Sequence, residues 1–129
     1  MAPRKLESLP IRSLRPWAKN ARTHSRKQIR QVADSIKRFG FTNPVLIDSE
    51  NTILAGHARV AAAELLGIGE VPCLRIDTMT PAEKRAYVLA DNKLALNAGW
   101  DEEILAEELK YLLGVDVDFD VGITGFSIP

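Results

Sequence analysis

Residues 53–67, written ILAGHARVAAAELLG, place polar side chains at the start of an otherwise plain helix. An apolar run ends at Gly56, and His57 and Arg59 fall in the first turn of the alanine-rich helix that the pattern predicts. The first N–H groups of a helix lack partners within it and lie beside the positive end of its dipole. Because Gly56 allows a tight turn and close approach of a ligand, this helix start is a candidate anion site.

The two polar side chains of this helix start suit a phosphate group. Arg59 supplies a permanent charge and a planar donor fork, and His57 can donate a hydrogen bond or carry charge near neutral pH. The alternative is a surface histidine and arginine at an ordinary helix start, which the four residues alone favour because such starts are common. His24, which precedes a predicted helix cap, is either a cap partner or a phosphate neighbour.

Short strands are predicted on both sides of this helix. Their ranges are residues 6–14, 43–48, 52–55 and 70–77. The second and third of these form a small β-hairpin around the turn Ser-Glu-Asn. Pro10 limits the first strand to an edge, and Pro72 marks the start or an edge of the last one.

Three longer helices are predicted from capping signals as well as from periodicity. Ser25 and Gln28 have the spacing of a capping box, and Gly40 is a stop signal. Thr80 and Glu83 repeat the capping-box spacing. The predicted helices cover residues 25–40, 80–97 and 101–114. Short strands come first and helices dominate later, which indicates an α+β fold.

Charge is distributed unevenly along this chain of 129 residues, although its net charge is zero. Residues 1–38 carry eleven Lys and Arg against two acids, whereas residues 82–129 carry four against ten. A basic N-terminal segment can meet a polyanion locally. The alternative, which charge alone favours, is a solvated face balanced by the acidic C-terminal part.

Composition excludes several classes of protein. Cys73 is the single cysteine, which excludes an internal disulfide and a cysteine-rich metal site. No apolar run reaches the ~18 residues of a membrane span, and the N-terminus lacks the apolar centre of a signal peptide. We therefore expect one compact domain in the cytoplasm, with no membrane partner.

Five ordered blocks of the sequence resemble the ParB-like N-terminal domain of the ParB/sulfiredoxin superfamily, over roughly residues 6–113. The blocks are NAR, SIKRFGFTNPVLID, ILAGHARVAAAELLG, EVPCLRID and RAYVLADNKLA. The resemblance implies a small mixed sheet with helices packed around it and a helical C-terminal part. The ParB-like domain should cover residues 1–113, and residues 114–129 should form an edge strand or a linker towards a missing methyltransferase domain.

The likeness is closest to the subgroup that precedes DNA methyltransferases in phages and mobile elements. The stretches LADNKLALNAGWDEEILAEEL and FDVGITGF carry this likeness. The resemblance implies that a methyltransferase domain is the partner in the full-length chain. We expect this sequence to be either a piece of such a chain or an isolated module.

The resemblance also implies a nucleotide site, for CTP or ATP with Mg²⁺. Gly56 and Arg59 match the first and last residues of the family's triphosphate motif, whereas His57 and Ala58 replace a glutamate and an arginine. Fewer positive side chains should weaken triphosphate binding or change which nucleotide fits. CTP hydrolysis, as in chromosome-segregation ParB, is therefore not implied.

Other positions complete the implied site. Asp91 and Asn92 correspond to the family's magnesium and phosphate motif, with Lys93 after them, and Asp91 is the candidate metal ligand. Without the family match, a solvated helix pair would be the better interpretation of Asp91 and Asn92. Arg22 matches an upstream arginine loop, and Asn43 lies in a turn near the base.

DNA contacts, if present, should come from the basic segment, because the last helices are acidic. The candidates are Arg15, Lys19, Arg22, Arg26, Lys27 and Arg30. Such contacts would be weak, non-specific and sensitive to salt. Trp17 either stacks on an exposed base or, as we prefer, packs over the sheet edge.

Three hypotheses of function follow. The leading one is a nucleotide- and DNA-associated ParB-like module of a DNA-modification system. The second is a metal-dependent nuclease or nucleotidase, such as a nucleoside triphosphatase, in which Asp91 holds the metal and His57 acts as acid or base. The third is a protein-interaction domain with a vestigial pocket, whose acidic helix 102–113 supports self-association. Sulfiredoxin activity is not expected, because His57 stands where that chemistry needs a cysteine.

Overall fold

The computed structural model describes residues 4–18, 20 and 23–127. Lys19 and Arg22 therefore lie outside the described residues, and their expected contacts with DNA and phosphate stay predictions.

Four strands form one mixed sheet, as the α+β prediction required. They are β1 (Leu6–Pro10), β2 (Val45–Ile47), β3 (Ile53–Ala55) and β4 (Glu70–Arg75). The strand order is β1-β4-β2-β3. β1 pairs antiparallel with β4, β2 pairs antiparallel with β3, and β2 pairs parallel with β4. The predicted hairpin and the edge position of Pro10 are confirmed. The expectation that Pro72 marks the start or an edge of its strand is wrong, because Pro72 is the third residue of the central strand β4 and is paired with Ser8 of β1. It precedes the residues of β4 that pair with β2.

The helices begin where their caps predicted. They are α1 (Arg26–Phe39), α2 (His57–Leu65), α3 (Pro81–Asn97) and α4 (Glu102–Gly114), with the short 3₁₀ helices η1 (Ile11–Ser13) and η2 (Val121–Thr124). Ser25 with Gln28, and Thr80 with Glu83, form both predicted capping boxes. The described residues contain no helix long and apolar enough to cross a membrane.

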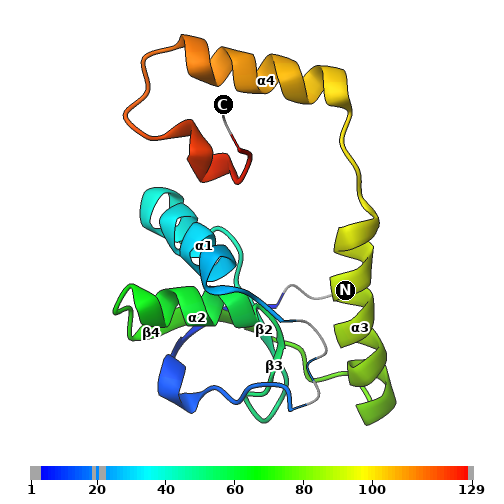
Figure 1. Cartoon of the computed structure of the whole chain (residues 1–129). Coiled ribbons are helices and arrows are strands. Elements are labelled where there is room, and N and C mark those ends of the chain that lie inside the picture. The colour runs from blue at the N-terminus through cyan, green and yellow to red at the C-terminus, as the bar shows by residue number, and fades with distance from the viewer. Residues whose placement is uncertain (1–3, 19, 21–22, 128–129) are drawn as a thin grey trace.

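The main core lies between the sheet and α2. Side chains of β2, β3 and β4 pack there against Val60 and Ala63 of α2. Cys73 is fully buried in this core, and burial raises the pKa of its thiol. A second cluster joins α1 to α2 through Ala33, Ile36 and Ala62. The start of α2 is thus held rigidly between the sheet and α1 (Figure 1).

The C-terminal helices pack less closely. α3 lies against β3 through Val88, which shares a small cluster with Leu54 and Ile76. α4 stands apart from the sheet, and the tail folds back between α4 and α1 (Figure 1).

The tail does not form the edge strand that was one of our two expectations. Its described part forms η2, because Gly122 donates its backbone N–H to the Asp120 side chain at 2.7 Å and Gly125 turns the chain at φ 90°. Phe119 then packs edge-to-face on Phe39 of α1, with ring centroids 6.4 Å apart. The linker alternative stays a prediction.

Candidate phosphate-binding site

The start of α2 has the uncapped geometry that an anion site needs. Gly56 occupies the N-cap at φ 107° and ψ 21°, a left-handed conformation that favours glycine. Gly56 has no side chain that could cap the helix, so the N-cap residue supplies no capping oxygen to the N–H groups of the first turn. They are therefore available to an anion at this end of the helix dipole.

A recess of about 150 Å³ opens at this helix start. Its lining residues are Asn20, His24, Leu54, Ala55, Gly56, His57, Ala58, Arg59, Asp91 and Asn92. Five predicted site residues, Gly56, His57, Arg59, Asp91 and Asn92, therefore lie together. The first three are at the start of α2 and the last two are in α3, and β4 with its loops separates these helices in the sequence. Asn43 and Lys93 are exposed and do not line the recess.

Arg59 lies across the mouth of its own helix. Its Nη2 atom donates a hydrogen bond to the Pro44 carbonyl oxygen at 2.9 Å, while its Nε atom is buried and has no hydrogen-bond partner among the described residues. A Cβ atom at Gly56 would lie 3.0 Å from Nη2, so the absence of that carbon makes room for the guanidinium. Burial lowers the pKa of Arg59, and the charges of Asp91 and Tyr87 act in the opposite direction. A buried donor without an acceptor costs on the order of 1–3 kcal/mol.

His57 uses one ring nitrogen to hold the chain before α1. The Trp17 backbone N–H donates to His57 Nε2 at 3.0 Å. Nε2 therefore carries no proton, and the neutral ring has its proton on Nδ1. Burial lowers the pKa of His57, and the charge of His24 lowers it further. Of the two roles that the sequence left open for His57, donating a hydrogen bond or carrying charge, the partly buried ring that accepts a hydrogen bond favours the first. One Nδ1–H donor is what it can offer a phosphate.

Asp91 and Asn92 face the helix start from α3. Asp91 is exposed, interacts electrostatically with Arg59 and hydrogen-bonds Tyr87. The pKa of Tyr87 is raised by burial and then by Asp91. Asn92 Nδ2 donates to the Val88 carbonyl oxygen one turn earlier at 3.0 Å, which fixes the orientation of its amide.

The part of the chain that the structure describes contains no metal site built entirely from protein side chains. No group of three or more His, Cys, Asp or Glu side chains there has the arrangement to hold a metal ion. Mg²⁺ retains several waters and often binds through one or two carboxylates together with substrate phosphates. Asp91 therefore fits a magnesium ion that arrives with a nucleotide better than a permanently bound one.

Two lining residues extend the site beyond our predictions. His24 was left undecided between a cap partner and a phosphate neighbour, and the structure places it in the recess. Asn20 also lines the recess, and its position in the NAR block was the signal that pointed to it. Both residues precede α1 in the sequence, and the tertiary structure brings them to the start of α2.

Sequence comparisons match most of the chain to one family. The profile described as the ParB N-terminal domain matches residues 2–93. The ParB-like nuclease domain-containing protein YnaK of Escherichia coli K12 is 50% identical over 76 residues, which are 59% of this chain and 87% of that protein. A probable chromosome 2-partitioning protein ParB of Deinococcus radiodurans is 29% identical over 91 residues, which are 67% of this chain and 31% of that protein.

Solved structures with the same fold include a ParB protein and a sulfiredoxin. C-terminally truncated ParB of Caulobacter crescentus in complex with CTP-gamma-S superposes with a TM-score of 0.72 at 21% identity, covering 85% of this chain and 63% of that one. Sulfiredoxin of Arabidopsis thaliana superposes with a TM-score of 0.54 at 20% identity, covering 65% and 97%. Likeness at these identities establishes the fold. The chain spans less than two thirds of the Caulobacter chain and about a third of the Deinococcus protein.

Proposed function

The chain belongs to the ParB N-terminal domain family, and from that premise we propose that it is a nucleotide- and DNA-associated module that binds a nucleotide phosphate at the start of α2. The observation that carries the proposal is the recess in which the uncapped helix start, Arg59 and Asp91 meet. The Caulobacter relative with the same fold was solved with CTP-gamma-S, which supports a nucleotide as the ligand class.

The size of the recess limits which part of a nucleotide it takes. Pockets that enclose whole drug-sized ligands measure roughly 300–1,000 Å³, whereas this recess measures about 150 Å³. It therefore suits the phosphates, and the sugar and base must lie outside it. Asn43 directly precedes Pro44, whose carbonyl oxygen accepts from Arg59, so a base beyond the phosphates would pass near Asn43. CTP and ATP with Mg²⁺ are the proposed ligands, and Asp91 is the proposed contact to the ion.

Calorimetric titration with CTP, ATP and GTP, with and without Mg²⁺, tests this site. We expect Arg59→Ala to weaken binding at least tenfold, because a charge-assisted hydrogen bond to phosphate contributes about 1.5–3 kcal/mol. Arg12→Ala is the matched control, since Arg12 is exposed in η1 and lines neither the recess nor a neighbouring pocket. Equal affinity in both variants would remove the proposal.

Hydrolysis at the same site is a second candidate, favoured by the nuclease-domain name of the Escherichia coli relative. Asp91 would hold the metal ion, and His57 would have to act through Nδ1, because Nε2 accepts from Trp17. Incubation of labelled DNA and of CTP with Mg²⁺ or Mn²⁺ tests this. Cleavage that Asp91→Asn abolishes would support an enzyme, and intact substrates would exclude it.

We propose that DNA is contacted through the start of α1. Arg26, Lys27 and Arg30 are exposed there, and the first turn holds no acidic residue. Cations at a helix N-terminus oppose the helix dipole, so folding alone does not favour them. Arg26→Gln with Arg30→Gln should reduce the slope of log affinity against log salt by about 2 for duplex DNA. An unchanged slope would place the DNA contacts elsewhere.

We also propose that α3 and α4 are covered by a partner. Large apolar side chains are exposed along both helices and in the connection between them: Leu89, Leu94, Leu96, Trp100, Ile104, Tyr111 and Leu113. Exposed apolar surface of this extent often marks an interaction site. The proposed occupant in a full-length chain is a DNA methyltransferase domain, as the sequence likeness of residues 89–109 suggests. Light scattering of this chain separates that proposal from self-association, because only self-association gives a mass that rises with concentration.

A further inference from the structure

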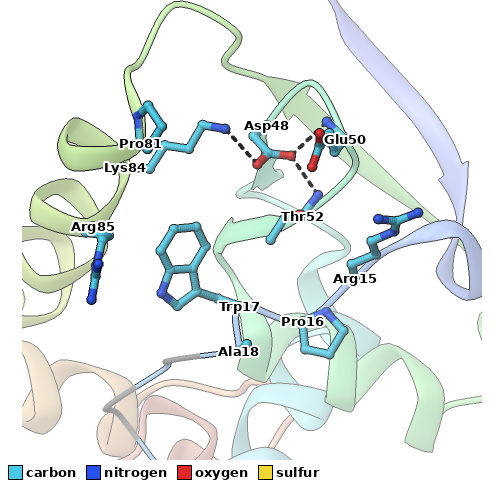
Figure 2. A pocket seen from close by; sticks show the side chains of 10 residues that line it. All are labelled: Arg15, Pro16, Trp17, Ala18, Asp48, Glu50, Thr52, Pro81, Lys84 and Arg85. Atoms are coloured by element: carbon cyan, nitrogen blue, oxygen red, sulfur yellow. Dashed lines mark hydrogen bonds and ion pairs between the residues drawn. The ribbon is translucent and has the colours of Figure 1, made fainter.

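A second and larger hollow lies beyond the phosphate recess. This cleft measures about 440 Å³. It is lined by Arg15, Pro16, Trp17, Ala18, Asp48, Glu50, Thr52, Pro81, Lys84 and Arg85. Figure 2 shows the Trp17 ring standing between Arg85 of α3 and Thr52, with Arg15 beyond Thr52. Its volume falls in the range of pockets that enclose a small organic ligand.

Trp17 is anchored in a fixed position in this cleft. Its ring packs against the cluster of Leu54, Ile76 and Val88, as we had preferred, while it also lines the cleft. Its backbone N–H is held by His57 Nε2 at 3.0 Å. A tryptophan that is fixed on one side and lines an open cleft on the other is a preorganised stacking surface, because little side-chain entropy remains to be lost on binding.

Five charged side chains line the cleft: the ion-paired Asp48 and Lys84, the acid Glu50 and the cations Arg15 and Arg85. The last three form no ion pair with a described residue. Asp48 Oδ2 accepts from Lys84 Nζ at 3.1 Å, and Asp48 Oδ1 accepts from the backbone N–H groups of Glu50 and Thr52 at 2.8 and 2.9 Å. This buried group therefore closes the wall between the hairpin turn and α3.

Arg15 and Arg85 are the remaining cations of the cleft. Both are exposed, and neither forms an ion pair with a described residue. They stand at opposite sides of the Trp17 ring in Figure 2. In a single strand, each base is flanked by a phosphate on either side. An aromatic ring that stacks on the base, with a guanidinium on either side to hold a phosphate, matches this arrangement.

We propose that this cleft binds a nucleotide unit, with the base stacked on Trp17 and a phosphate held by Arg85 or Arg15. The shared chemistry is a planar heteroaromatic ring that carries a phosphate, and its source is a free mononucleotide or an unpaired nucleotide of single-stranded DNA. The cleft is distinct from the recess at Gly56–Arg59, because the two share no lining residue. Lys84 and Arg85 precede Asp91 and Asn92 by seven positions, so the two sites lie about 10 Å apart along α3.

Tryptophan fluorescence tests this proposal directly. The chain has two tryptophans, so Trp100→Phe leaves Trp17 as the single reporter. This variant would be titrated with dTMP, with an eight-residue oligothymidylate and with an abasic oligomer of the same length. We expect saturable quenching by the oligothymidylate, with an affinity that falls about threefold to fivefold in Arg85→Ala or Arg15→Ala, because both cations are exposed. Arg12→Ala again serves as the matched control.

The probes distinguish the source of the ligand. Quenching by both dTMP and the oligothymidylate would support the proposal with a free nucleotide as a ligand, and quenching by the oligomer alone would support it with single-stranded DNA. Equal quenching by the abasic oligomer would overturn the proposal, because no base would then be stacked. Absence of quenching would overturn it too.

Two further controls separate this site from the recess and from misfolding. Quenching that disappears in Arg59→Ala would overturn the proposal, since the signal would then come from the recess through His57 and the Trp17 backbone. Quenching that persists in that variant would support it, whether or not the recess binds a nucleotide. Because Arg15 and Arg85 are exposed, the variants should unfold at the same urea concentration as the parent.

Discussion

The recess at Gly56–Arg59 and the cleft beside Trp17 share three elements but are built differently. Residues before α1 (15–18 for the cleft and Asn20 for the recess), the hairpin with its turn, and α3 contribute to both. The recess is made by what a helix start leaves unsatisfied, namely uncapped N–H groups and the buried Nε of Arg59. The cleft is made by contacts that are complete, since the Asp48 carboxylate has three partners and Trp17 packs on an apolar cluster.

This difference explains why the two hollows suit different parts of a ligand. Unsatisfied donors beside a helix dipole favour an anion and offer little to an uncharged ring. A fixed indole in a mainly apolar cleft favours a ring and gains only modestly from exposed cations. His57 joins the two hollows, because it lines the recess and holds the backbone of Trp17.

Removing the carboxylate that closes the cleft should have the largest effect on stability. Asp48→Ala leaves Lys84 and two backbone N–H groups without their acceptor, and the Asp48 side chain is 4% exposed. We expect the free energy of unfolding in urea to fall by about 3 kcal/mol. Glu7→Gln, which breaks the more exposed pair with Arg75, should cost much less. Equal losses would mean that the buried carboxylate does not organise the cleft.

A methyl group at the helix start should damage the recess and spare the cleft. Gly56→Ala places a carbon 3.0 Å from Arg59 Nη2 at a backbone φ of 107°. We expect a loss of about 1–2 kcal/mol in stability and the loss of nucleotide binding at the recess. Gly67→Ala is the matched control, because Gly67 also has a positive φ of 74° but open space around it. It should show similar backbone strain and normal binding in calorimetry.

The link between the two hollows should be sensitive to pH. The folded-state pKa of His57 is lowered, mainly by burial, so folding favours the neutral ring. Its contribution to stability is therefore fully present above the unfolded pKa of about 6.5 and is lost as pH falls through the folded value. His57→Gln should make the free energy of unfolding less dependent on pH between about 7.5 and 5.5 than it is in the parent chain. The free energy of unfolding of His24→Gln should keep most of the pH dependence of the parent chain. If His24→Gln lost more of this dependence than His57→Gln, His24 and not His57 would be its source.

Local signals explain the parts of the structure that were predicted well. Capping boxes at Ser25 and Thr80 lie within three residues of their partners, and both helices begin where these boxes placed them. The hairpin and the glycine-started helix are equally local features, which is why the phosphate mouth could be recognised from its residues. The structure of the tail was harder to predict from the sequence. Alternating valine and aspartate suits a strand, but the Asp120 side chain accepts a hydrogen bond from the Gly122 backbone and so forms a turn instead.

The sequence by itself determined the helix starts, the mixed α and β content and the polar residues at the mouth of α2. Tertiary structure alone decided what those residues do. It paired His57 with Trp17 across 40 residues, Asp48 with Lys84 across 36 and Arg59 with Pro44 across 15. The physical reason is range: a cap or a turn is a contact between near neighbours, whereas burial and long-range hydrogen bonds depend on how the sheet, α2 and α3 meet. Burial made His57 a neutral acceptor, and long-range contacts turned Trp17 into the wall of a cleft.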